Sequence, residues 1–134
     1  MRFSTKGDYG LALMVGLARR HGQGSTAVRT LSRTEHVPYA YAEQLIGRLK
    51  RHRLLKSVRG SQGGYQLIRE PGRITVGDVI QALEDDNLVA CQRPGVNCPR
   101  QGFCRTHGVW SKIKSELQNT MDRISLKDLL NSKT

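Results

Sequence analysis

Cysteine is absent from the first 90 residues and from the last 30 residues of this chain. All three cysteines lie in one short stretch, Cys91-x6-Cys98-x5-Cys104, and His107 lies three residues after the last of them. An odd number of clustered cysteines argues against a disulfide framework and favours metal binding. All the cysteines that could bind a metal therefore lie in one stretch of the chain.

The chain also lacks a long hydrophobic run. No stretch of about 18 apolar residues occurs, which excludes a transmembrane helix. Arg2 and Lys6 stand at the N-terminus, but residues 7–10 interrupt any apolar core that a signal peptide would need. We therefore expect a cytoplasmic protein with no membrane partner.

Acidic residues are scarce, and they are unevenly distributed. The chain of 134 residues has 22 Lys and Arg against 11 Asp and Glu, for a net charge of +11. Residues 1–73 contain 14 basic and 4 acidic residues, whereas residues 74–134 contain 8 and 7. Positive charge confined to one half is typical of a protein that binds a phosphate backbone, although a solvated basic face or a membrane-surface patch has the same composition.

The apolar periodicity predicts helices and one hairpin in a definite order. Thr5 and Asp8 have the spacing of a capping box at the first helix, and Thr75 and Asp78 have it at a later one. Glycines and Arg59 lie between two short apolar runs, as at a hairpin tip. We expect helices over residues 4–20, 26–35, 38–52, 75–84 and 104–124, and strands over 54–58 and 64–68.

This order predicts a mainly α fold with a small β-hairpin wing (α+β), that is, a winged helix-turn-helix domain followed by a long helix. We divide the chain into a DNA-binding domain at 1–86, a cysteine-rich loop at 87–103, and a dimerisation helix with its tail at 104–134. The last helix has apolar residues at a 3-4 alternation, which is the seam along which two helices pack: Trp110, Ile113, Leu117, Met121 and Ile124.

The third helix and the hairpin carry the candidate DNA contacts, because a helix fits the major groove and outward polar side chains reach base edges there. Tyr39, Tyr41, Glu43 and Gln44 are the candidates for base contacts, and Arg48, Lys50 and Arg51 for phosphates. At the wing, Arg59 is placed to enter a narrow minor groove, with Ser61 and Gln62 beside it. The simpler alternative is an ordinary hairpin with a solvated arginine.

The cysteine stretch allows three kinds of chemistry. Cys104 and His107, three residues apart at the expected helix start, can share one helix face, and Cys91 and Cys98 lie on a loop that can wrap round to them. Three thiolates and an imidazole suit an iron–sulfur cluster or zinc. The wide cysteine gaps favour the cluster, and a metal-free thiol switch is the third possibility. Catalysis by Cys104 with His107 as base lacks an orienting third group, so we do not expect an enzyme.

The chain resembles the IscR/NsrR-type winged-helix transcription regulators over nearly its whole length. The matching segments, together with the three-cysteine stretch, are MRFSTKGDYG at 1–10, VPYAYAEQL at 37–45, RGSQGGY at 59–65, ITVGDVI at 74–80 and ISLKDLL at 124–130. The resemblance implies a homodimer built along the last helix that binds double-stranded promoter DNA, most often as a repressor. It also implies a 2Fe–2S or 4Fe–4S cluster that senses iron–sulfur status, iron, nitric oxide or redox state.

By the same resemblance, Cys91, Cys98 and Cys104 would hold the cluster. Two residues match the positions of the family's fourth ligand. In one branch the ligand is the histidine that His107 matches. In another branch it is an aspartate of the partner subunit that ligates a 4Fe–4S cluster, and Asp8 matches it. We favour His107 and a 2Fe–2S cluster, because Asp8 has a simpler role as half of a helix cap. A winged-helix regulator with a structural zinc site or a thiol redox switch is the alternative.

Overall fold

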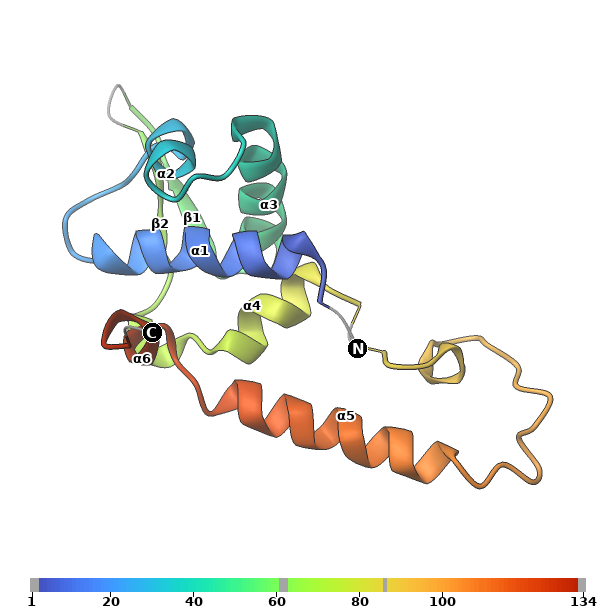
Figure 1. Ribbon diagram of the computed structural model, residues 1–134. Coiled ribbons are helices and arrows are strands. Elements are labelled where there is room, and N and C mark those ends of the chain that lie inside the picture. The colour runs from blue at the N-terminus through green and yellow to red at the C-terminus, as the bar shows by residue number, and fades with distance from the viewer. Residues whose placement is uncertain (1–2, 61–62, 86, 133–134) are drawn as a thin grey trace.

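The computed structural model describes residues 3–60, 63–85 and 87–132, and it confirms the expected fold class (Figure 1). Two short 3-10 turns, Pro71–Arg73 and Ala90–Gln92, accompany the helices and strands. In chain order these are α1 (Thr5–Arg19), α2 (Val28–Thr34), α3 (Tyr39–Arg51), β1 (Leu55–Val58), β2 (Gly64–Leu67), α4 (Val76–Leu83), α5 (His107–Asp122) and α6 (Leu126–Leu130).

Helix α1 lies at the centre of the winged half, by which we mean residues 3–85. The helices α2 and α3 pack on one side of it, and α4 and α6 pack on the other (Figure 1). Its buried side chains Leu13 and Met14 are fully covered, as are Leu31 of α2, Leu49 of α3 and Val79 of α4. One apolar core thus connects all the helices of this half.

A glycine allows α1 and α4 to lie very close together. A Cβ atom at Gly10 would stand 2.0 Å from Cδ1 of Leu83, so any larger residue at position 10 would force the two helices apart. The packing of α1 on α4 therefore depends on the absence of a side chain at this position.

The wing is an antiparallel hairpin in which Leu55 pairs with Leu67 and Val58 with Gly64. Its second strand also pairs with the segment before α2, because the Thr26 and Tyr65 backbones exchange hydrogen bonds of 2.9 and 2.8 Å. This pairing fixes the strands of the hairpin to the helical part of the winged half.

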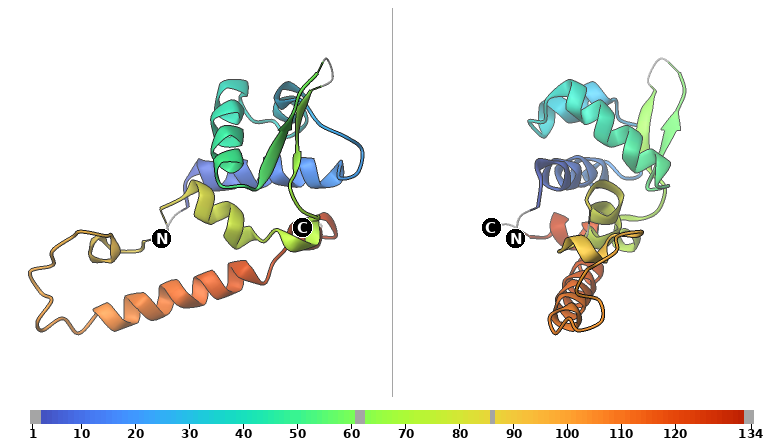
Figure 2. Two further views of the ribbon diagram at one scale, coloured as in Figure 1. Left: turned by 180° about the vertical axis from the view of Figure 1, so that it is seen from behind. Right: turned by 90° about the vertical axis from the view of Figure 1, so that its right-hand side faces the viewer.

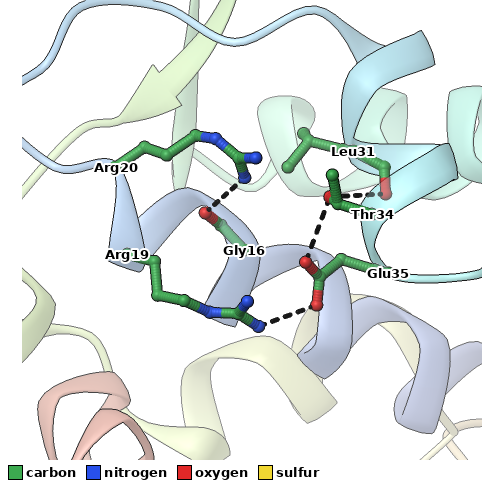
Figure 3. A network of polar contacts seen from close by, with 6 residues as sticks. All are labelled: Gly16, Arg19, Arg20, Leu31, Thr34 and Glu35. Carbon is green, nitrogen blue, oxygen red and sulfur yellow. Dashed lines mark hydrogen bonds and ion pairs between the residues drawn. The ribbon is translucent and has the colours of Figure 1, made fainter.

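A polar network joins α1 to the end of α2 (Figure 3). The Glu35 carboxylate accepts hydrogen bonds from Arg19 at 2.9 Å and from the Thr34 hydroxyl at 3.2 Å, and only 7% of the Glu35 side chain is exposed. Gly16 makes room for it, since a Cβ there would lie 3.0 Å from a Glu35 carboxylate oxygen. The network holds α2 at a fixed position on α1.

Residues 87–125, which we call the arm, leave the winged half and return to it (Figures 1 and 2). No described residue of the arm is buried. At the end of α5 the chain rejoins the core: the Val76 amide donates to the Ile124 carbonyl at 2.8 Å, and the Leu126 amide to the Ile74 carbonyl at 2.9 Å. Leu126 itself is fully buried, so the C-terminal end of α5 is anchored.

Two local expectations about the start of a helix are wrong. The N-cap of α1 is Ser4, whose hydroxyl accepts from the Lys6 amide, and Thr5 and Asp8 form no capping box. The last helix begins at His107, so Cys104 precedes it and the two do not share a helix face. The expected box of Thr75 with Asp78 does form.

Candidate nucleic-acid interface and cysteine cavity

Helix α3 has one buried face and one polar face. Its inward side chains are Ala42, Leu45, Ile46 and Leu49. Glu43 and Gln44 are exposed on the other face, as the sequence predicts for residues that read base edges. The outer face of α3 is therefore exposed and can enter a groove of DNA.

The first turn of α3 carries a stacked arrangement that the sequence does not predict. The guanidinium of Arg29, from α2, lies 4.3 Å from the centre of the Tyr39 ring, a cation–π contact. The Tyr39 hydroxyl donates to the Glu43 carboxylate at 2.5 Å. The Glu43 carboxylate raises the pKa of Tyr39, so the hydroxyl stays a donor. Arg29 and Glu43 are thus both oriented by one aromatic ring.

Tyr41 faces inward toward α1. Its ring meets the Tyr9 ring edge-on at 5.6 Å between centroids, and its hydroxyl lies 3.4 Å from the hydroxyl of Thr5. Because the side chain is half-buried, the structure uses Tyr41 to seat α3 on α1.

Basic side chains gather at the end of α3 and on the wing. Arg48, Lys50 and Arg51 occupy the last turn of α3, and Arg59 is exposed where β1 ends. Figure 2 shows α3 and the hairpin projecting on the same side of the molecule, away from α5. The predicted wing contacts Ser61 and Gln62 lie outside the described residues.

All four predicted ligands of the cysteine stretch line one cavity. It has a volume of about 400 Å³ and is lined by Cys91, Val96, Cys98, Gln101, Cys104 and His107. The three cysteines are half-buried and unpaired with one another, and His107 is exposed at the first position of α5. Residues from the 3-10 turn, the loop and the long helix thus converge on one space.

The cavity does not close on a single ion. Within the described part of the chain, no three His, Cys, Asp or Glu side chains stand close enough together to hold a metal ion. Asp8, the alternative ligand, is exposed in the first turn of α1 and does not line the cavity of its own chain.

The surroundings of Cys104 favour its thiolate form. The hydroxyl of Thr106, 3.4 Å from its sulfur, lowers the pKa of Cys104, and the backbone amides of Thr106 and His107 and the charge of Arg100 act in the same direction. A lowered pKa favours the thiolate, which is the form that binds metal or reacts with oxidants.

The sequence profile of the Rrf2 family, which is described as an iron-dependent transcriptional regulator, matches residues 3–132. The chain belongs to the Rrf2 family. It is 35% identical over 133 residues to the HTH-type transcriptional regulator CymR of Bacillus subtilis strain 168, with 96% of this chain and 89% of that protein covered.

Two solved structures of Rrf2-type regulators superpose on the whole fold. The IscR of T. potens has a TM-score of 0.79 and 37% identity, covering 98% of this chain and 87% of that one. The structure of CymR (YrzC), described as the global cysteine regulator of B. subtilis, has a TM-score of 0.78 and 34% identity, covering 100% of this chain and 99% of that one.

Membership of the Rrf2 family confirms two expectations from the sequence: the chain is a DNA-binding transcription regulator, and it is not an enzyme. Among the described residues, no helix is long and apolar enough to cross a membrane.

Two residues of this Rrf2 chain were not predicted from its sequence. Arg29 reaches α3 from a different helix, and Glu84 bonds to residues about 80 positions away. Neither belongs to a local motif, so only the tertiary structure could identify them.

Proposed function

We propose that this chain is a homodimeric repressor whose promoter binding is controlled by an iron–sulfur cluster. The observation that carries the proposal is that Cys91, Cys98, Cys104 and His107 line a single cavity. These residues come from three separate segments, and their spacing in the sequence does not require them to meet.

The cavity fits a cluster better than it fits zinc. A structural zinc site is a closed tetrahedron of four ligands around one ion, whereas these four side chains surround a space of about 400 Å³ without closing on an ion. Thiolates and imidazole are ligands of iron–sulfur clusters. We therefore favour a 2Fe–2S cluster on the three cysteines and His107, with Asp8 of the partner subunit and a 4Fe–4S cluster as the alternative.

The cluster would supply redox-sensitive and nitric-oxide-sensitive iron, and the chain's own residues would convert its presence into a change of shape. Cys91 and Cys98 belong to the loop, and His107 opens α5. Ligation would tie the start of α5 to the cysteine loop that follows α4, while the other end of α5 is already anchored to the winged half through Ile124 and Leu126. In a two-fold dimer, this would set the spacing of the two recognition helices against their half-sites.

The apolar side of α5 supports the dimer. Val109 is 49% exposed, and Trp110 and Ile113 are each 36% exposed, so a row of large apolar side chains lies open on one helix. A row of this kind marks an interaction surface, and its 3-4 spacing fits a second copy of the same helix.

A metal-free thiol switch is the second candidate. It is favoured by the lowered pKa of Cys104, because a thiolate is the form that reacts with oxidants. The two candidates share the DNA-binding assignment and differ in whether iron is needed.

The test is DNA affinity with and without the cluster. An operator is first selected from random DNA with the anaerobically purified protein, and its affinity is then measured for loaded protein, stripped protein and Cys98→Ala. We expect loaded protein to differ from the other two by at least tenfold, and Cys98→Ala to match stripped protein. Equal affinity of all three would reject cluster control. Dependence on peroxide and reductant without iron would support the thiol switch.

A further inference from the structure

The carboxylate of Glu84 joins two parts of the molecule that are far apart in the sequence. One of its oxygens, Oε1, accepts three hydrogen bonds: from the Ser4 amide at 3.0 Å, from the Gly7 amide at 3.0 Å and from the Ser4 hydroxyl at 2.5 Å. Amides at the start of a helix have no partner within the helix, so Glu84 of α4 caps the first turn of α1. Figure 1 shows the end of α4 beside the beginning of α1.

The site is shaped for this carboxylate. A Cβ atom at Gly7 would lie 2.9 Å from Oε1 of Glu84 and 3.0 Å from the end of the Ile80 side chain, so a residue larger than glycine would crowd the contact. Glu84 is half-buried and ends α4, where its own amide donates to the Ile80 carbonyl at 2.8 Å. Glu84 is therefore held by its backbone at the end of α4 and by its carboxylate at the start of α1.

Glu84 is also followed directly by residues whose side chains bond to the cysteine loop and to α5. The carboxylate of the next residue, Asp85, accepts from Asn87 at 3.0 and 2.9 Å and pairs with Arg93 at 3.0 Å. Asn87 in turn accepts from Lys114 of α5 at 2.9 Å. A movement of the cysteine loop or of α5 thus reaches the backbone of Glu84 within a few residues.

The beginning of α1 contacts the beginning of α3. The Thr5 hydroxyl lies 3.4 Å from the Tyr41 hydroxyl, and the Tyr9 ring meets the Tyr41 ring edge-on. A shift of this turn would therefore displace Tyr41, and with it the beginning of α3.

We propose that Glu84 is the positioning residue that links the cysteine loop to the recognition helix, through its cap on the first turn of α1. The inference rests on the proposed function, because it names the route by which the loop's state would reach the DNA-reading surface. Glu84 does not line the cavity; it acts by holding Ser4 and Gly7, and so Tyr41, in place.

The first experiment needs no cluster: hydrogen exchange of the full-length, metal-free protein, followed in peptides that cover residues 3–9 and 41–46. Loss of a cap bond corresponds to about a 3- to 10-fold increase in local exchange. Glu84→Ala should speed exchange in both peptides. Gly7→Ala, which displaces the carboxylate without removing it, should do the same.

Two matched variants complete this experiment. Glu84→Gln keeps the oxygen that accepts all three bonds and should behave as wild type, and Glu70→Ala removes an exposed carboxylate and should change neither peptide. Faster exchange in residues 3–9 alone would make Glu84 a helix cap only and would overturn the inference. So would a Glu84→Gln protein that exchanges like Glu84→Ala.

The second experiment compares DNA affinity in the loaded and the stripped protein. In wild type the two affinities should differ by at least tenfold, and in Glu84→Ala they should agree within about twofold while iron content and dimerisation stay unchanged. A Glu84→Ala protein that keeps the wild-type ratio would overturn this inference and leave the proposed function standing. A wild-type ratio of one would overturn both.

Discussion

The winged half and the arm are built in different ways. Every buried apolar side chain that the structure describes belongs to residues 13–83 or is Leu126, while none between 87 and 125 is buried. The winged half is therefore shaped by its own core. The arm has no buried side chain among its described residues, and it presents exposed apolar side chains and a cavity lined by cysteines. We therefore assign DNA binding to the winged half and sensing to the arm in the proposed function.

The largest effect should come from the core of the winged half. Leu49 of α3 is fully buried, and Leu49→Ala should lower the free energy of unfolding by about 2–5 kcal/mol. Val96→Ala on the arm, where the side chain is 44% exposed, should change it by less than about 0.5 kcal/mol. Urea denaturation followed by circular dichroism measures both; equal losses would show that the arm has a core of its own.

The next largest effect should be on dimerisation, in a variant whose winged half stays folded. Ile113→Glu places a charge in the apolar row of α5 and should weaken dimerisation by about 2 kcal/mol or more. The matched control is Asn119→Glu. Asn119 is exposed and lines a groove of mostly polar residues between α4 and α5. Light scattering coupled to gel filtration gives the mass. An unchanged dimer in Ile113→Glu would place the dimer interface elsewhere.

A smaller effect should appear in the salt dependence of DNA binding. Arg51 lies in the last turn of α3, and Arg51→Ala should weaken binding to all sequences and lower the salt slope by about 1, as expected for one lost phosphate contact. Lys112→Ala removes one positive charge from an exposed position on the arm. If both variants lowered the slope equally, net charge and not position would explain the binding.

The smallest effect should come from the wing. Arg59→Ala should cost about 1 kcal/mol where the operator flank is A·T-rich and less where it is G·C-rich, because a narrow minor groove attracts arginine most strongly. Binding to two operators that differ only in the flank provides the measurement. An equal loss on both would leave Arg59 with a phosphate role alone.

Much of the winged half could be predicted from the sequence, because its elements follow local periodicity. The hairpin, the buried face of α3 and the capping box of Thr75 are all set by residues close in the chain, and all are confirmed. The cap of α1 was predicted wrongly because its main acceptor is Glu84, a residue about 80 positions away. Local spacing cannot reveal a partner at that distance.

The arm was harder to predict for a related reason. The apolar seam and the cysteine stretch are visible in the sequence, but the start of α5 was placed three residues too early, at Cys104 instead of His107. Cys104 has a side-chain contact with Thr106 and lies in the loop. That the four candidate ligands meet in one cavity depends on the path of the loop between 92 and 106, which has no periodicity to follow.

The central claim is tested most directly by an absorption spectrum of protein purified without oxygen, with iron and acid-labile sulfide assayed on the same sample. The account predicts a coloured protein with equal iron and sulfide and two irons per chain, and a Cys98→Ala protein that lacks both. Four irons per chain would favour the alternative with Asp8. A colourless protein that contains zinc, or that takes up no iron on reconstitution, would contradict the claim of a cluster.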